Sequence, residues 1–208
     1  MRLACLGSLL APPLCWACGV TAREGEPLCR ACRATLRWLA PEPVPLAGLQ
    51  AWAPLAYEGA ARELVRALKF RGAQGLADTM AAAIAANAPL GWFGEARPAL
   101  VPVPLHPARR RRRGFNQAER LAAALAARTG LPLADCLQRE RAPQQVGRAR
   151  AERTHAGGFA AAAPPPPAVV LVDDVVTTGG TLAACAAALT SAGSPQIAAV
   201  AFARTLAR

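Results

Sequence analysis

Residues 169–181 read VVLVDDVVTTGGT, and the fold class can be inferred from this segment. The β-branched run Ala168–Val172 predicts a strand that is buried on both faces, and the residues after it predict a helix from about Gly180 to Ala192. Strands that alternate with helices in this way indicate an α/β domain with a mainly parallel, doubly wound sheet. Such sheets bind ligands at the carboxyl ends of their strands, which is where two adjacent aspartates stand in this sequence.

The loop after the strand combines the residue types of a phosphate site with those of a sugar site. Glycines let the backbone close around a phosphate, the amino terminus of the next helix presents free N–H groups, and threonine hydroxyls add donors. The carboxylates repel phosphate but accept hydrogen bonds from vicinal hydroxyls, directly or through water on Mg²⁺. A strand, turn and helix that bind no ligand are the alternative. The favoured interpretation is a ribose 5-phosphate site formed by Asp173, Asp174, Val175, Val176, Thr177, Thr178, Gly179, Gly180 and Thr181.

The composition is typical of a folded globular protein, since 53% of the 208 residues are hydrophobic and 18% are charged. The net charge of +11 comes almost entirely from arginine, whose planar guanidinium suits phosphate groups. Polyanionic partners are therefore expected, with a general compositional preference for arginine as the alternative explanation. No apolar run approaches the roughly 20 residues that cross a bilayer, so we expect no membrane span.

Four of the seven cysteines form two C-x-x-C pairs, Cys15 with Cys18 and Cys29 with Cys32. Two pairs with this spacing can surround one tetrahedral ion, so the sequence predicts a Zn²⁺ site with these four ligands. Four thiolates leave no open coordination position, and the zinc is expected to be structural. A redox-active C-x-x-C and unligated buried cysteines are the alternatives. The odd number of cysteines favours a reducing compartment, and we expect a cytoplasmic protein.

The chain is expected to divide into three parts. Residues 1–40 form the zinc module, residues 41–50 contain alternating prolines and form an extended linker, and residues 51–208 form the main domain. Within the main domain the pattern predicts strands at Trp52–Tyr57, Ala99–Val103 and Ile197–Phe202, helices at Gly59–Phe70, Leu76–Ala88 and Asn116–Thr129, and loops at Pro104–Arg113 and Gln138–Gly158.

The motif at residues 169–181 resembles the signature for phosphoribosyl pyrophosphate (PRPP) in type I phosphoribosyltransferases. Three other segments narrow the resemblance: LKFRG at 68–72, VPVPLHPARRRRRGFNQAERLA at 101–122, and RAPQQVGRARAERTHAGGF at 141–159. Together with the paired cysteines, they are similar to the ComF family of amidophosphoribosyltransferase-like competence proteins. The resemblance implies a type I phosphoribosyltransferase-like sheet with a small amino-terminal zinc-ribbon-like module.

The same resemblance implies roles for particular residues. Asp173 and Asp174 would hold the ribose, and Mg²⁺ would accompany PRPP. The loop after the strand Ala99–Val103 would contact pyrophosphate through Leu105, His106 and Arg109. A flexible loop would close over PRPP with Gln145, Arg148, Arg150 and Arg153, of which Arg148 and Arg150 would act in catalysis beside the two aspartates.

Three functions stay open at the level of the sequence. The first is phosphoribosyl transfer from PRPP to an unknown acceptor. The second is binding of single-stranded DNA during DNA uptake, with little turnover and with contacts from Arg110, Arg111 and Arg112, although a solvated basic face explains these arginines equally well. The third is a regulator that uses an inactive enzyme fold as a ligand sensor.

Overall fold

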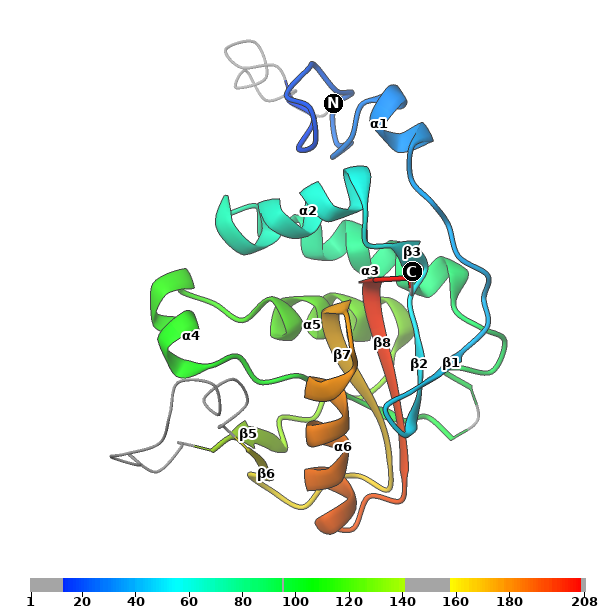
Figure 1. Ribbon diagram of the computed structural model, residues 1–208, viewed down its shortest axis with the longest axis vertical. Helices are drawn as coiled ribbons and strands as arrows, with labels where there is room; N and C mark the ends of the chain where they lie inside the picture. Colours follow the sequence, from blue (N-terminus) through cyan, green and yellow to red (C-terminus); the bar gives the residue numbers. More distant parts are fainter. Residues whose placement is uncertain (1–12, 95, 141–157, 207–208) are drawn as a thin grey trace, which may run out of the picture.

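The computed structural model describes residues 13–94, 96–140 and 158–206, and its centre is a six-stranded sheet (Figure 1). The path across the sheet is β1, β2, β8, β7 and β4, and β3 also pairs with β8. Only the pairing of β1 with β2 is antiparallel. The strands are β1 (Val44–Leu46), β2 (Leu49–Trp52), β3 (Leu55–Ala56), β4 (Ala99–Pro102), β7 (Ala168–Val176) and β8 (Gln196–Arg204).

Both faces of the sheet are covered, as a parallel sheet requires. One face carries α2 (Gly59–Phe70), α3 (Leu76–Asn87) and α5 (Gln117–Thr129), and the other carries α6 (Gly180–Ser191). A small antiparallel hairpin of β5 (Leu137–Arg139) and β6 (Phe159–Ala161) packs beside α6. The expected α/β architecture with a mostly parallel sheet is therefore confirmed.

The central strand β7 divides the core into two layers by simple alternation. Val170 and Val172 belong to the cluster under α2, α3 and α5, whereas Val169 and Leu171 belong to the cluster under α6. Successive side chains of a strand point to opposite faces, and this alternation holds from Val169 to Val172. Near the end of the strand Val175 packs against the first cluster and Val176 belongs to the second, so the order of the layers changes across the two aspartates.

Most predicted elements lie where the sequence places them, but β7 is longer than expected. The helix Gly59–Phe70 matches in both bounds, Asn116 caps α5, and Gly130 ends it with φ 67°. The strand predicted at Trp52–Tyr57 is interrupted at Ala53–Pro54, which gives β2 and β3. β7 continues to Val176, so the two aspartates lie within the strand and not after it.

The loop predicted at Pro104–Arg113 is wrong, because residues Pro107–Arg113 form helix α4. His106 caps the helix by accepting a hydrogen bond from the N–H of Ala108, and Gly114 ends it with φ 82°. Proline is well tolerated at the first position of a helix, and arginine is a good helix former. Pro107 is therefore the first residue of the helix, and only residues 104–106 of the predicted loop are without regular structure.

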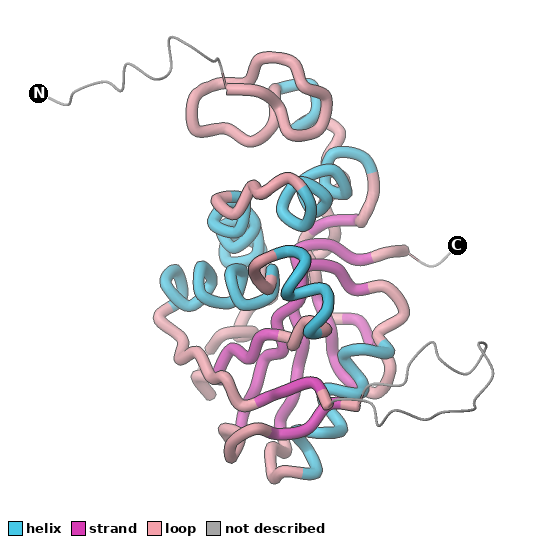
Figure 2. The backbone as a smooth tube through the Cα atoms, turned by 90° about the vertical axis from the view of Figure 1, so that its left-hand side faces the viewer, coloured by secondary structure: helices cyan, strands magenta, loops and turns pink. Residues whose placement is uncertain are grey.

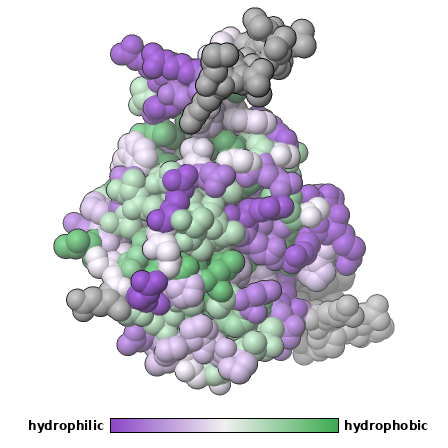
Figure 3. All heavy atoms as spheres, turned by 180° about the vertical axis from the view of Figure 1, so that it is seen from behind, coloured by the Kyte–Doolittle hydropathy of each residue, from purple (hydrophilic) through white to green (hydrophobic). Residues whose placement is uncertain are grey.

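The amino-terminal module, residues 13–40, lies above the helices at one end of the sheet (Figures 1 and 2). It contains the short helix α1 (Arg30–Ala34), and its surface is largely hydrophilic in Figure 3. The chain then enters the segment expected as a linker, where the structure has strand β1. The amino-terminal module is thus followed directly by the edge of the sheet.

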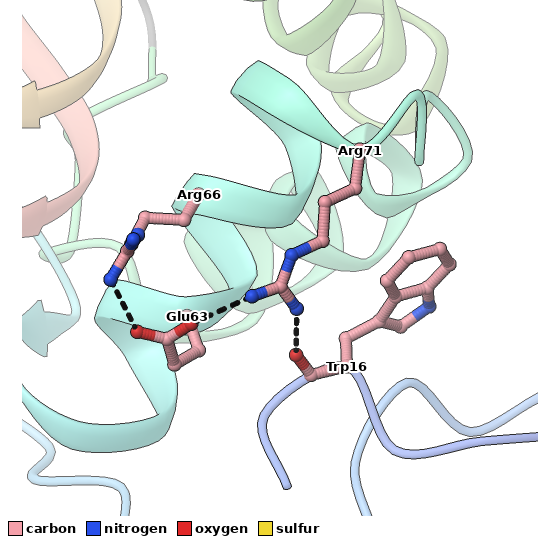
Figure 4. A network of polar contacts seen from close by, with 4 residues as sticks. All are labelled: Trp16, Glu63, Arg66 and Arg71. Atoms are coloured by element: carbon pink, nitrogen blue, oxygen red, sulfur yellow. Dashed lines mark hydrogen bonds and ion pairs between the residues drawn. The ribbon is translucent and has the colours of Figure 1, made fainter. Parts of the chain in front are cut away.

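Arg71, just after α2, attaches the amino-terminal module to the main domain (Figure 4). Its guanidinium donates to the carbonyl oxygen of Trp16 at 3.0 Å and to the Glu63 carboxylate at 3.2 Å. Arg66 also donates to Glu63, at 3.2 Å. Since Trp16 lies between Cys15 and Cys18, this network connects α2 to the first cysteine pair.

Candidate functional site

The phosphate-type loop lies at the carboxyl end of β7 and leads into the first turn of α6. Thr177, Thr178 and Thr181 are exposed, and Gly179 is buried at the turn itself. α6 begins at Gly180, so the free N–H groups of its first turn lie at this edge of the sheet. Exposed hydroxyls and a helix amino terminus at the end of a parallel strand form a suitable environment for an anion.

Only glycine fits at position 179. Its φ is +79°, and an added Cβ would lie 2.6 Å from Cγ of Leu46 and 3.2 Å from Cβ of Ala47. Leu46 ends β1, and Ala47 begins the turn to β2. The tip of the β1–β2 hairpin therefore packs against the loop and holds its shape from the side.

The two aspartates face different layers of the fold. Asp174 points to the side of α2, where its Oδ2 lies 2.8 Å from Nζ of Lys69, and the side chains of Asp174 and Lys69 are 4% and 21% exposed. The angles of this approach are not those of a hydrogen bond, so the contact is an ion pair. Asp173, which precedes Asp174, lies on the side of α6, where its charge acts on Cys185 of that helix.

Burial, followed by the neighbouring charge of Asp174, raises the pKa of Asp173 well above the usual range of a carboxyl. The charge of Lys69 and the N–H of Asp174, which donates to Oδ1 of Asp173 at 2.8 Å, act in the other direction but are weaker. A carboxyl with a raised pKa is costly to ionise, which is a common property of groups in functional sites. A ligand that donates hydrogen bonds to Asp173 would lower this cost.

Arg113, at the end of α4, joins Lys69 on the α2 side of β7. Its guanidinium lies over the ring of Phe70, 5.1 Å from the centroid, and its Nη1 is buried without a hydrogen-bond partner among the described residues. Burial lowers the pKa of Arg113, and the charge of Asp174 opposes that effect. We call Asp174, Lys69 and Arg113 the Asp174 cluster.

The sequence analysis did not assign roles to Lys69 and Arg113. Lys69 lies near the end of the predicted helix Gly59–Phe70, and Arg113 is one of five consecutive arginines. A signal was available in the segments LKFRG and RRRGF, because Lys69 directly precedes the exposed Phe70, and Arg113 stands two residues before the half-buried Phe115.

A similar arrangement lies on the α6 side of β7. The guanidinium of Arg139 is over the ring of Phe159 at 4.9 Å, and its Nε is buried without a partner among the described residues. Burial and then the charge of Asp173 raise the pKa of Cys185, whereas Arg139 lowers it. Asp173, Arg139 and Cys185 therefore interact electrostatically at the base of the hairpin that leads into residues 141–157.

The residues predicted for pyrophosphate occupy the start of α4. Leu105 is half-buried, His106 caps the helix, and Arg109 is exposed. Arg110 forms an ion pair with Glu119 at 2.7 Å, and Arg111 and Arg112 are exposed. The flexible-loop candidates Gln145, Arg148, Arg150 and Arg153 lie outside the described residues.

The four paired cysteines come together in the amino-terminal module. The sulfur atoms of Cys15, Cys18, Cys29 and Cys32 all lie within 4.8 Å of one another, and Sγ of Cys18 is 3.8 Å from Sγ of Cys29. A tetrahedral Zn²⁺ with Zn–S bonds of about 2.3 Å has its sulfurs about 3.8 Å apart. This cluster could therefore hold a metal such as zinc.

The thiols of this cluster influence one another. Burial alone would raise the pKa of Cys15, but hydrogen bonds from the backbone N–H groups of Cys29, Cys18 and Ala17 outweigh it and lower the pKa to about 6. Hydrogen bonding to Cys18, with burial next, raises the pKa of Cys32 to about 12. Backbone donors that stabilise a thiolate are what a metal-binding knuckle requires.

Residues 110–208 match the family model of the phosphoribosyl transferase domain. This part of the chain runs from α4 to the end of the sequence and includes β7, the glycine loop and α6. These residues are therefore similar to a phosphoribosyl transferase domain, and they contribute β7 and β8 to the mostly parallel sheet described above.

Among solved structures, the chain is similar to the crystal structure of orotate phosphoribosyltransferase from Aeropyrum pernix. The identity is 20%, the TM-score is 0.34, and the match covers 81% of this chain and 75% of the other. A search of curated proteins gave no match. None of the helices in the described part of the chain has the length and apolar character to cross a lipid bilayer.

Replacing Gly179 with alanine is expected to destabilise the fold. The left-handed φ alone costs roughly 1–2 kcal/mol for an L-residue, and the contact with Leu46 adds to it. Urea unfolding measures the loss, and Gly180→Ala is the matched control because its added Cβ meets only Oγ1 of Thr178, at 3.8 Å. Equal losses in the two variants would refute the role of the hairpin contact.

Replacing Asp173 with asparagine is expected to stabilise the unliganded protein at pH 7. The raised pKa means that ionising Asp173 costs stability as pH rises from the unfolded value near 3.9 through the folded pKa. Asparagine removes that cost and keeps an acceptor for the N–H of Asp174. Each 1 kcal/mol added to the free energy of unfolding should raise the Tm by roughly 2–4 °C, and this increase in Tm should vanish near pH 3. A lower Tm at pH 7 would be contrary to this account.

The purified protein is expected to contain about one zinc ion per chain, as a four-cysteine structural site does. Metal analysis of the double variant Cys18→Ser/Cys29→Ser should show that the zinc is lost. Cys136→Ala is the control, since Cys136 is buried outside the cluster. Zinc retained in the double variant would exclude these ligands.

Proposed function

We propose that the carboxyl edge of the sheet binds PRPP or ribose 5-phosphate and that the protein is a phosphoribosyltransferase-type enzyme. The observation that carries the proposal is an aspartate pair, Asp173 half-buried and Asp174 buried, directly beside a glycine loop at the amino terminus of α6. Carboxylates suit the ribose hydroxyls, and the loop suits the 5-phosphate. The match of residues 110–208 to the phosphoribosyl transferase domain supports the same ligand class.

In this proposal each group has a defined task. The backbone of Thr177–Thr181 and the threonine hydroxyls bind the 5-phosphate, and Asp173 accepts hydrogen bonds from the ribose. Mg²⁺, which would arrive with PRPP, supplies positive charge to the diphosphate. Arg148 and Arg150 would approach the leaving diphosphate from the loop at 141–157, as the resemblance to the ComF family implies, and the acceptor is unassigned.

A second candidate function is binding of single-stranded DNA, as the link of the ComF family to competence implies. Exposed arginines favour it: Arg111 and Arg112 on α4, and Arg23, Arg30 and Arg33 around a cleft of about 590 Å³ on the amino-terminal module. Two separate basic surfaces suit a flexible polyanion better than one small ligand. Glu26 pairs with Arg33 at 2.7 Å and reduces the free charge of that cleft.

Calorimetric titration with ribose 5-phosphate and with PRPP, each with and without Mg²⁺, tests the first proposal. We expect binding of both ligands, with Mg²⁺ strengthening PRPP, and at least a tenfold loss of affinity in Thr181→Val, which keeps the shape of the side chain and removes its hydroxyl. Ribose is the control ligand. No binding of PRPP at millimolar concentration would refute the proposal.

Binding measurements on a double variant of α4 distinguish DNA binding from binding of the small phosphate ligands. Arg111→Gln/Arg112→Gln should weaken binding of a single-stranded oligonucleotide and reduce its salt dependence, while the affinity for ribose 5-phosphate stays within about twofold. Oligonucleotide binding that is indifferent to both salt and these substitutions would eliminate the DNA function.

A further inference from the structure

The peptide group of Trp16 is held by both halves of the cysteine cluster. Trp16 directly follows Cys15, and its N–H donates to the carbonyl oxygen of Pro27 at 3.0 Å, two residues before Cys29. The sulfur atoms of the four paired cysteines lie within 4.8 Å of one another. A metal ion that joins the two pairs would therefore also hold this peptide group in place, and small metal-binding modules typically lose their structure without the metal.

Arg71 contacts this peptide group from the end of α2 (Figure 4). Its Nη1 donates to the carbonyl oxygen of Trp16 at 3.0 Å, and its Nη2 donates to Oε2 of Glu63 at 3.2 Å. Arg66 donates to the other carboxylate oxygen of Glu63, and its hydrogen bonds among the described residues stay within α2. The side chains of Arg71 and Arg66 have almost the same exposed fraction, 48% and 49%. The two arginines therefore differ mainly in the contact with the amino-terminal module.

A cleft of about 370 Å³ lies between the amino-terminal module and the start of α3. Its lining residues include Trp16 and Pro27 of the module and Leu76 and Thr79 of α3. Side chains do not fill this side of the junction, so the polar contact of Arg71 has a larger share in fixing how the module is oriented.

The last turn of α2 also carries the cation that acts on both aspartates of the candidate site. The N–H of Arg71 donates to the carbonyl oxygen of Ala67 at 3.0 Å, and Nζ of Lys69 lies 2.8 Å from Oδ2 of Asp174. Burial and then the charge of Asp174 raise the pKa of Asp173, and the charge of Lys69 opposes them. If the last turn of α2 frayed, this charge would be removed from the aspartate pair, and ionised carboxylates would be harder to keep there.

We propose that Arg71 is a positioning residue through which the metal-loaded cysteine cluster supports binding of a sugar phosphate at the carboxyl end of β7. This inference rests on the proposed function and adds a means of regulating the same site. With the metal bound, Trp16 presents its carbonyl oxygen, Arg71 is held at the end of α2, and Lys69 stays beside the aspartates. When the metal is lost, Arg71 loses that acceptor and the last turn of α2 is released. Coupling between two binding equilibria is reciprocal, so the sugar phosphate strengthens metal binding by the same factor.

The test measures the affinity of the full chain for zinc, by competition with a chromogenic chelator, with and without saturating ribose 5-phosphate. In the unaltered protein we expect ribose 5-phosphate to raise the zinc affinity about fivefold, a small coupling because the contact of Arg71 is half exposed. In Arg71→Met this factor should fall below about twofold. Arg66→Met is the matched control and should keep the full factor, and ribose is the control ligand.

The ratio of the two zinc affinities distinguishes coupling from a general loss of stability. A substitution that only destabilises the fold lowers the zinc affinity with and without ribose 5-phosphate alike and leaves their ratio unchanged. Arg71→Lys keeps the charge but cannot bridge Trp16 and Glu63 with one planar group, so it should restore only part of the factor. Thermal unfolding of each zinc-loaded variant establishes that it is folded.

Hydrogen exchange gives a second readout that needs no ligand. In the zinc-loaded protein the amide protons of Lys69 and Phe70 should exchange about fivefold faster in Arg71→Met than in Arg66→Met, because the last turn of α2 opens more often. Removal of zinc should accelerate the same amides in the unaltered protein and have little further effect in Arg71→Met.

Two results would overturn the inference while the proposed function stands. The first is that ribose 5-phosphate binds but leaves the zinc affinity of the unaltered protein unchanged. The second is that Arg71→Met keeps the full factor, which would assign the coupling to the buried apolar cluster that Leu28 shares with Leu64 of α2. Failure of the unaltered protein to bind ribose 5-phosphate would instead count against the proposed function itself, and the exchange rates would then decide whether Arg71 connects the metal site to α2.

Discussion

Two adjacent carboxylates at the end of a strand that is buried on both faces must point into different layers, and the arrangement around β7 depends on this constraint. Asp174 enters the α2 layer and is neutralised by Lys69 at 2.8 Å, whereas Asp173 enters the α6 layer, where burial raises its pKa. Neither layer could accept both charges without a larger penalty, since burial and like charges act in the same direction. The strand therefore divides one acidic pair into two electrostatic environments.

Helix α2 connects the amino-terminal module with this arrangement. Arg71, directly after the helix, binds the carbonyl of Trp16 between two cysteines, and Lys69, two residues earlier, pairs with Asp174. Phe70, between them, supports the guanidinium of Arg113. Three consecutive residues thus contact the amino-terminal module, α4 and β7. The position of the last turn of α2 is consequently determined from three sides, as preorganised charge in a site requires.

The elements that local rules determine were predictable from the sequence. The helix Gly59–Phe70 follows from its apolar spacing, α5 from its cap Asn116 and its stop Gly130, and β7 from its β-branched run. The cysteine cluster follows from the spacing of its pairs, because short knuckles form locally. Two local rules compete at Pro107, because proline disfavours the interior of a helix but is favoured at its first position. The sequence prediction of a loop followed the first rule, whereas the structure follows the second.

The composition of the Asp174 cluster could not be predicted in this way. Lys69, Arg113 and Asp174 are far apart in the chain, and their contact depends on α2 and α4 meeting at the end of β7, which no local pattern specifies. The contact between Leu46 and Gly179 could not be predicted from a local pattern either. The sequence explained Gly179 by phosphate binding, and the structure adds that Leu46 leaves no room for a larger side chain there. Residues whose type follows from a local rule could be identified from the sequence, whereas residues whose role is a long-range electrostatic contact could not. A fold that buries an ion pair and leaves an arginine donor without an acceptor among the described residues loses stability at that point, and such losses persist where a ligand offsets them.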